Sequence, residues 1–228
     1  MKYFRPTTFN EYCSVSKQNH TLLAGGTDLI PRYEQGKQLP KTIVDLKKLP
    51  NLNKIKFVSI NLEIGAATTI EEIKNNDLIK KQFPALQQAT IDFGSVQIRN
   101  RATIGGNICN ASPAGDLLPA LYAFEANLLL RNKDGNRLAK IEDFILSPGK
   151  TAIQENEILE KIIIPESYSK SVFRKLGLRE AMAISVVNFA IIYEDNKLTI
   201  AVGAVAPTIL IFKGLSKLSI EQILNKIK

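Results

Sequence analysis

Two glycine pairs are the residues of this sequence best suited to contact a ligand through their backbone. Gly25-Gly26 and Gly105-Gly106 each follow an apolar run and lead into small polar residues, Thr27-Asp28 and Asn107. A doubled glycine allows positive φ and removes the Cβ atoms that hold a ligand away, so successive N–H groups can converge on an anion. Two such loops predict that both hold one phosphorylated cofactor. On the glycines alone, two unrelated tight turns remain an alternative.

Conventional catalytic groups do not accompany the glycines. No P-loop lysine follows either pair, which argues against a nucleoside-triphosphate site of the P-loop type. No G-x-G-x-x-G turn follows a strand, which argues against a Rossmann dinucleotide site. His20, the only histidine, lies in a polar segment without a nucleophile motif. Together with Cys13 and Cys109 it makes too small a set for a metal centre or an iron–sulfur cluster, which needs about four ligands. We therefore expect no catalytic residue and no metal here, and a cofactor that supplies the chemistry.

Asp116 closes the polar segment that follows the second glycine pair. It is a suitable N-cap for the apolar helix predicted after it. It is equally suited to accept a hydrogen bond from an N–H or hydroxyl group of a cofactor. The residues alone leave both interpretations open.

Composition sets the class of protein. The 228 residues suffice for one large domain or two small ones, and 45% hydrophobic with 23% charged residues is the globular range. No apolar run is as long as a membrane span and the N-terminus lacks the pattern of a signal peptide, so we expect a cytoplasmic protein. The net charge is 30 − 22 = +8, but the basic residues are scattered, which argues against a nucleic-acid partner.

The elements that must position these residues alternate between helices and strands, so an α+β fold is predicted. The patterns indicate strands over 22–24, 42–46, 54–60, 62–66, 96–104, 127–131, 137–141, 158–164, 184–193 and 197–205. They indicate helices over 6–12, from 69 onward, and over 83–93, 117–126 and 219–227. The strand over 96–104 is expected to run into the second glycine pair. A polar stretch over 166–171 is typical of a linker, with a domain boundary near residue 168.

The residues around the glycine pairs resemble the FAD-binding (medium) subunit of molybdenum hydroxylases, which include bacterial xanthine and carbon monoxide dehydrogenases. Four segments carry the resemblance, in the family's order: Leu22–Leu29, Leu62–Thr69, Ala102–Asp116 and Phe173–Glu180. The resemblance covers almost the whole chain, and the third segment is the most specific. It implies a two-part FAD-binding domain of the PCMH/vanillyl-alcohol-oxidase type over 1–167, with subdomains of about 1–53 and 54–167. A small sheet-plus-helix domain over 168–228, shorter than is usual in the family, is expected to follow.

The resemblance implies cofactor contacts at the matched positions. It places the FAD diphosphate against the backbone N–H groups of two segments, Leu22, Leu23, Ala24, Gly25, Gly26, Thr27, Asp28, Leu29 and Thr103, Ile104, Gly105, Gly106, Asn107. Side chains of Thr27, Thr103 and Asn107 are expected to add hydrogen bonds. Phe93 is expected at the adenine end, although a core phenylalanine that closes a helix would fit the sequence too.

Three further positions are matched to the flavin end. Asp116 is the acidic residue there and Leu159 an apolar one. Lys175, or its neighbour Arg174, is the basic residue expected beside the isoalloxazine, where a cation stabilises negative charge on the reduced ring. The positions of His20 and Cys109 do not match covalent-attachment sites, so non-covalent FAD is expected.

The function implied is that of an electron-transfer subunit. In such complexes a large molybdopterin-binding subunit oxidises the substrate and a small [2Fe-2S] subunit passes electrons to FAD, which reduces NAD+ or another acceptor. The molybdenum cofactor and the [2Fe-2S] clusters are expected only in those partners. Two alternatives are a stand-alone FAD-dependent oxidoreductase of the same superfamily, for which no acid/base residue is evident, and a basic binding module without a cofactor.

Overall fold

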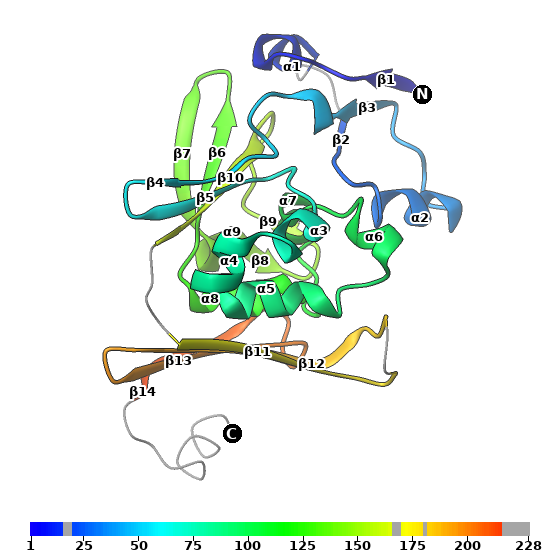
Figure 1. Cartoon of the computed structure of the whole chain (residues 1–228). Coiled ribbons are helices and arrows are strands. Elements are labelled where there is room, and N and C mark those ends of the chain that lie inside the picture. Colours follow the sequence, from blue (N-terminus) through cyan, green and yellow to red (C-terminus); the bar gives the residue numbers. More distant parts are fainter. Residues whose placement is uncertain (16–19, 166–169, 180–181, 216–228) are drawn as a thin grey trace.

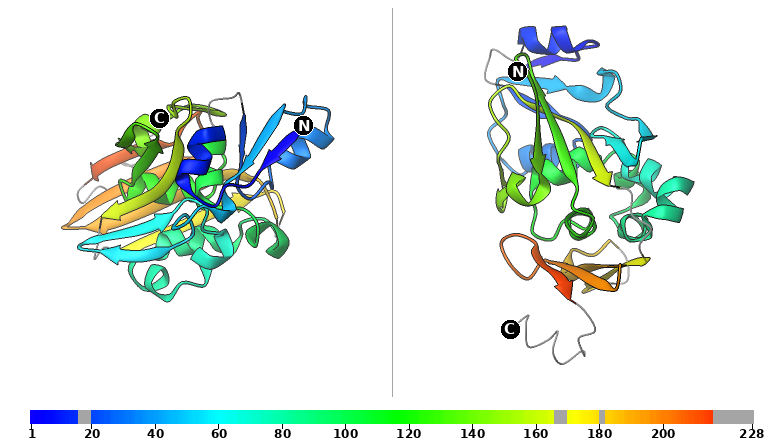
Figure 2. Two further views of the ribbon diagram at one scale, coloured as in Figure 1. Left: turned by 90° about the horizontal axis from the view of Figure 1, so that it is seen from above. Right: turned by 90° about the vertical axis from the view of Figure 1, so that its left-hand side faces the viewer.

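The computed structural model of the chain describes residues 1–15, 20–165, 170–179 and 182–215. Its elements form three tiers: an N-terminal group around a small sheet, a middle sheet with its helices, and a C-terminal sheet (Figure 1; Figure 2, right). The mixture of helices and sheets confirms the predicted α+β class. The helix predicted over 219–227 lies outside the described residues.

The N-terminal tier is built on a parallel three-stranded sheet of order β1-β3-β2. Its strands are β1 (Lys2–Phe4), β2 (Thr21–Leu23) and β3 (Thr42–Asp45), joined by α1 (Phe9–Val15) and α2 (Leu29–Glu34). The 3₁₀ helix η1 (Leu46–Lys48) follows β3. All of β3 is buried because it is the central strand. Tyr12 of α1 packs with Val44 and Leu46 in a small core of this tier. The arrangement places the end of β2, and hence the first glycine pair, beside Asp45.

The middle tier is an antiparallel sheet of order β4-β5-β10-β6-β7. Its strands are β4 (Ile55–Val58), β5 (Asn61–Gly65), β6 (Asn127–Asn132), β7 (Gly135–Lys140) and β10 (Ile158–Pro165). Alternate apolar residues such as Leu62 and Ile64, or Ile162 and Ile164, are buried, as expected for strands with one face on a core. A short hairpin of β8 (Ile145–Ser147) and β9 (Lys150–Thr151) comes before β10 in the sequence.

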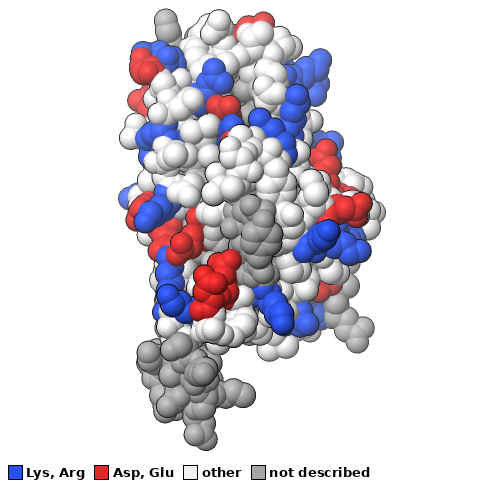
Figure 3. All heavy atoms as spheres, turned by 60° about the vertical axis from the view of Figure 1, so that its left-hand side comes forward, with Lys and Arg blue, Asp and Glu red and all other residues white. Residues whose placement is uncertain are grey.

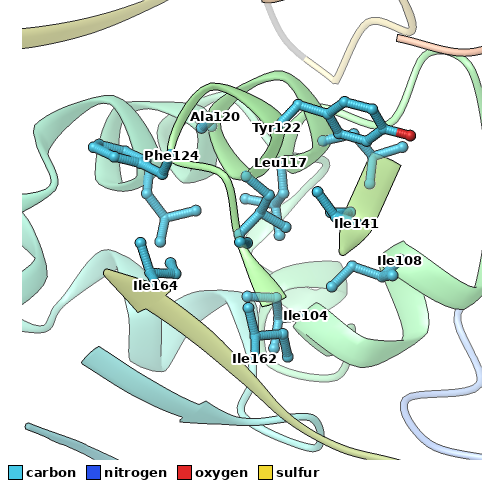
Figure 4. Close-up of a cluster of buried hydrophobic side chains, with 14 of the residues drawn as sticks. Ile104, Ile108, Leu117, Ala120, Tyr122, Phe124, Ile141, Ile162 and Ile164 are labelled. Atoms are coloured by element: carbon cyan, nitrogen blue, oxygen red, sulfur yellow. The ribbon is translucent and has the colours of Figure 1, made fainter. Parts of the chain in front are cut away.

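Short helices cover the buried face of this sheet. They are α3 (Ile70–Lys74), α4 (Asp77–Gln82), α5 (Pro84–Ile91), α6 (Val96–Arg99), α7 (Ile104–Asn110), α8 (Leu117–Ala123) and α9 (Ile141–Phe144). All seven residues of α8 are buried. Figure 4 shows Leu117 and Ala120 of α8 in one cluster with Ile108 of α7 and Ile162 of β10. A helix that is apolar on every side fits this place, because it is covered by the middle tier and by the C-terminal sheet.

The C-terminal tier is an antiparallel meander of order β11-β12-β13-β14. Its strands are β11 (Lys170–Gly177), β12 (Ser185–Glu194), β13 (Lys197–Gly203) and β14 (Leu210–Leu215). Helix α5 packs on β11, and α8 packs on β12 and β13. The strands predicted over 184–193 and 197–205 are confirmed as β12 and β13, which pair antiparallel.

The strand predicted over 96–104 is wrong. The residues form α6, a turn and the start of α7, because Ser95 and Thr103 each cap a helix. Ser95 Oγ accepts from the N–H of Ile98 at 3.2 Å, and Thr103 Oγ1 from the N–H of Gly106 at 3.0 Å. The alternation of apolar and polar residues predicted a strand with its apolar side chains buried. In the structure Val96 and Ile98 are exposed, whereas Arg99 is buried.

Candidate cofactor-binding site

A cavity of about 480 Å³ lies where the two glycine segments meet. This volume is in the range of small-molecule sites. The lining residues come from the region of β2 and α2, from η1, from the turn after β5, from α6 and α7, and from β9 to β10: Leu22–Leu29, Arg32, Leu46, Leu52, Ala66, Ala67, Phe93, Ile98, Ala102, Thr103, Gly105–Asn107, Cys109, Asn110, Thr151, Ile153 and Leu159. The structure thus brings together most of the residues that the sequence singled out. Ile104, Asp116 and Lys175 do not line the cavity.

The first glycine segment offers unused hydrogen-bond donors. The backbone N–H groups of Gly25, Gly26 and Thr27 donate to no acceptor among the described residues. The carbonyl of Ala24, in contrast, accepts from Lys47 Nζ at 3.2 Å. Gly26 has φ +78°, which favours glycine. This segment can therefore hold an anionic group in the cavity.

Asp45 fixes the position of Lys47 behind that segment. Its buried carboxylate accepts from Tyr3 Oη at 2.5 Å and from the N–H of Lys47 at 3.0 Å, and it pairs with Lys47 Nζ at 3.2 Å. Burial acts to raise the pKa of Asp45, but the hydrogen bonds from Tyr3 and Lys47 outweigh it and lower the pKa. The carboxylate therefore stays charged and ties β1, β3 and η1 to the first glycine segment.

Two of the glycines permit close packing of the backbone. A Cβ on Gly25 would lie 2.1 Å from the carbonyl oxygen of Arg101, and a Cβ on Gly105 would lie 2.6 Å from that of Ala66. Gly25 therefore lets the first segment lie against the residues that precede α7. Gly105 lets α7 approach the end of β5, where its N–H donates to Ala66 O at 2.8 Å.

The second glycine pair is not the open loop that the sequence predicted. It forms the first turn of α7, and its N–H groups already have acceptors in the chain. Ile104 donates to Thr68 O at 3.0 Å, Gly106 to Thr103 Oγ1 at 3.0 Å and Asn107 to Thr103 O at 2.9 Å. What this segment offers the cavity is different: space beside Gly106, and the buried Oδ1 of Asn107, which has no hydrogen-bond partner.

Phe93 forms an aromatic part of the cavity wall and is held by its neighbours. Arg99 Nη1 donates to the carbonyls of Phe93 and Gly94 at 3.4 and 3.3 Å. Arg99 Nε donates to Glu71 Oε2 at 2.7 Å, and this bond lowers the pKa of Glu71. The buried guanidinium thus fixes the turn after α5 and with it the aromatic ring.

Asp116 and Lys175 are brought together, but neither lines the cavity. Lys175 Nζ lies 2.7 Å from Asp116 Oδ2, and Ser185 Oγ and Asn188 Nδ2 donate to Asp116 Oδ1 at 2.6 and 3.1 Å. Asp116 occupies the N-cap position of α8, as one of the two interpretations has it, but its side chain makes no capping hydrogen bond. The cluster joins the start of α8 to the C-terminal sheet. Arg174 donates instead to Phe173 O at 2.7 Å.

Several lining residues were not predicted. Arg32, Cys109, Asn110 and Thr151 are the polar ones, and burial raises the pKa of the Cys109 thiol to about 12, so it stays neutral. For Arg32 the sequence carries a signal: it stands four residues after Asp28, a spacing that places the two side chains on one face of a helix. Asn110 has no such signal, because its partner Arg32 is 78 residues away.

The groups in the cavity fit a ligand that carries phosphate, hydroxyl and ring groups. Free N–H groups of the first segment suit the phosphate, the unpaired Oδ1 of Asn107 suits a hydroxyl or ring N–H, and Phe93 and Leu159 are apolar walls. Within the described ranges, no group of three or more His, Cys, Asp or Glu is placed to hold a metal. None of the described helices combines the length and apolar character needed to cross a membrane.

Known proteins resemble the chain in sequence and in structure. The model of the family described as FAD binding domain in molybdopterin dehydrogenase matches residues 1–167. The nicotinate dehydrogenase FAD-subunit of Eubacterium barkeri is 35% identical over 195 residues, 82% of this chain and 66% of that protein. The xanthine dehydrogenase FAD-binding subunit of Escherichia coli O157:H7 is 32% identical over 217 residues, 90% of this chain and 74% of that protein.

A solved structure shows the same fold. A chain of the carbon monoxide dehydrogenase from Hydrogenophaga pseudoflava that lacks the Mo-pyranopterin moiety superposes with a TM-score of 0.87 at 26% identity. The match covers 92% of this chain and 77% of that one. The chain is therefore shorter than these relatives, spanning 66% to 77% of their lengths.

Proposed function

Because the chain belongs to the family of FAD-binding domains in molybdopterin dehydrogenases, we propose that it binds FAD non-covalently and transfers electrons as one subunit of a molybdenum hydroxylase complex. The observation that carries the proposal is the cavity shared by the two glycine segments. Residues with unused backbone donors line it, and so does Asn107, whose buried amide oxygen has no hydrogen-bond partner among the described residues.

Named residues have separate tasks in this proposal. The N–H groups of Gly25, Gly26 and Thr27 bind the diphosphate, and Asn107 accepts from a hydroxyl or ring N–H. Phe93 packs against the adenine end, held by Arg99, and Leu159 forms an apolar wall toward the flavin. Ile104 is fully buried, so its contribution is to the packing of α7.

The residues around the cavity bind the cofactor and do not exchange protons with a substrate. When bound, FAD supplies the electron-accepting and electron-donating ring. Among the described lining residues the ionisable ones are Asp28, Arg32 and Cys109. Asp28 and Arg32 pair with each other at 2.7 Å, and the raised pKa of Cys109 keeps the thiol neutral. This favours an electron-transfer subunit over a stand-alone oxidoreductase, which needs an acid or base over the flavin.

If this chain carries only FAD, the other redox centres of the complex belong to partner subunits. We infer a large molybdopterin-binding subunit and a small [2Fe-2S] subunit, with NAD+ or another acceptor receiving the electrons. The relatives are named as FAD subunits or, in the carbon monoxide dehydrogenase of Hydrogenophaga pseudoflava, as a medium chain. Two cysteines and one histidine in 228 residues do not supply the ligands of an iron–sulfur cluster, which supports placing the clusters in another chain.

Anaerobic reduction by substrate tests the proposal. The FAD-loaded chain is mixed with xanthine or nicotinate, first alone and then together with its large and small partner subunits. We expect the visible absorbance of the flavin to persist with the chain alone and to bleach when partners and their substrate are present. Oxidation of either heterocycle by the chain alone would contradict the proposal and favour a stand-alone oxidoreductase.

A further inference from the structure

We propose that Arg32 retains the cofactor by bridging the two glycine segments beside the cavity, an inference that rests on the proposed function of that cavity as the FAD site. Arg32 lies in α2, directly after the first segment. Its Nη2 donates to Oδ1 of Asn110 at 2.9 Å, and Asn110 is the last residue of α7. Arg32, Asn110 and Asp28 all line the cavity.

Asp28 fixes the orientation of the guanidinium. Its Oδ2 lies 2.7 Å from Arg32 Nε and its Oδ1 3.2 Å from Arg32 Nη2. This two-pronged contact holds the planar guanidinium in one orientation. The same Nη2 thereby reaches Asn110, so the bridge connects three residues in a fixed order, Asp28, Arg32 and Asn110.

Helix α2 has little else to hold it in place. None of its residues is buried, and Figure 1 shows it at the edge of the molecule. Residues 29–34 make several described hydrogen bonds, and nearly all of their partners lie within residues 26–37. Among those described, only the bond from Arg32 to Asn110 has its partner outside this segment. Helix α2 can therefore move away from α7 once this bond breaks, while β2 and Gly25 stay in place.

Charge adds to the effect of the bridge. Among the described residues that line the cavity, Arg32 is the one cationic side chain. The diphosphate of FAD is anionic, so it attracts this side chain toward the cavity. The side chain of Arg32 is 44% exposed, which makes the bridge weak enough to open and limits its expected effect to a few-fold.

The rate of FAD release tests the bridge. The variants are Arg32→Gln, Asn110→Ala and the double variant, with Lys37→Gln as a control that removes a cation near α2 without touching Asn110. Each single bridge variant should release FAD about three- to fivefold faster, the double variant no faster than the singles, and the control at the wild-type rate. Thermal unfolding of the cofactor-free chains should be unchanged, because α2 buries no side chain.

The outcomes separate the bridge from the proposed function. Wild-type release rates in the single variants, or effects that add in the double variant, would overturn the bridge while FAD binding by the wild-type chain still supports the proposed function. Failure of the folded wild-type chain to bind FAD would overturn both.

Discussion

The four paired glycines differ in what requires each of them. Gly26 has a positive φ, and Gly25 and Gly105 lie so close to other backbone atoms that a Cβ would collide with them. A Cβ on Gly106 would meet one atom closely, Thr103 Oγ1 at 3.0 Å, and otherwise open space. Gly106 is therefore the position at which a side chain fills the cavity with the least harm to the fold.

Lys175 illustrates how a residue matched to a flavin site can serve the fold. Its ammonium and the carboxylate of Asp116 are both nearly buried, with side-chain exposures of 8% and 10%. We predict that Lys175→Met lowers the free energy of unfolding by about 3 kcal/mol, because it leaves the buried carboxylate without its counter-ion. Urea unfolding of the cofactor-free chain measures the effect.

A matched control separates this effect from loss of charge in general. Lys133→Met removes a lysine whose pair with Asp134 is exposed, and the stability should not change. Unchanged stability in Lys175→Met together with weakened FAD binding would show instead that the lysine acts on the cofactor, as the family resemblance implies.

At the scale of elements, the longer strands were predictable and the shortest helices were not. The alternation of buried Leu62 and Ile64, or of Leu128 and Leu130, extends over a whole strand and is visible in the sequence. Helix α6 has four residues, about one turn, which is too short for a helical period to develop. The N-cap residues, Ser95 of α6 and Thr103 of α7, were the better signal, because each offers an oxygen to an N–H three residues later.

The cavity was predictable where its lining is contiguous in sequence. Residues 22–29 follow one another and carry a recognisable glycine pair, so they could be assigned together. The contact of Arg32 with Asn110 and that of Asp116 with Ser185 join residues 78 and 69 positions apart. Such pairs depend on how the tiers pack, which local patterns do not encode. For the same reason the hydrogen bonds that α7 makes to Thr68 and Ala66 could not be foreseen.

The start of β10 depends on an ion pair between the buried carboxylate of Glu157 and the partly exposed Arg137. Arg137 Nε and Nη2 of β7 contact Oε1 and Oε2 of Glu157 at 2.7 and 2.8 Å, and the N–H of Gln154 donates to Oε2 at 2.7 Å. Burial acts to raise the pKa of Glu157, but the bonds from Arg137 and Gln154 outweigh it and lower the pKa. The pair holds the segment that carries Leu159 to the cavity.

We predict that Glu157→Gln lowers the free energy of unfolding by about 2 kcal/mol at neutral pH. A carboxylate with a lowered pKa in the folded state stabilises above its unfolded pKa of about 4.3, and this contribution is lost as the pH falls toward the folded value. The difference between wild type and variant should therefore shrink below about pH 4 in urea unfolding. A difference that stays constant from neutral to acid pH would contradict the assignment.

At the scale of the whole molecule, the three tiers explain how a cavity and a rigid support coexist. The N-terminal tier supplies the first glycine segment, whose helix α2 buries nothing, while the middle tier supplies α7 and the buried helix α8. On the face shown in Figure 3, basic and acidic side chains lie intermixed, so the net charge of +8 is not gathered there into one basic area.

Titration of the purified, cofactor-free chain with FAD tests the central claim most directly. We predict saturation at one FAD per chain, with the appearance of bound-flavin absorbance and a rise in unfolding temperature, since a ligand that binds only the folded state stabilises it. Gly106→Val should weaken binding by at least about tenfold, equivalent to 1.4 kcal/mol, while the cofactor-free variant unfolds near the wild-type temperature. A folded wild-type chain that binds no FAD, or a valine variant that binds it equally well, would contradict the account.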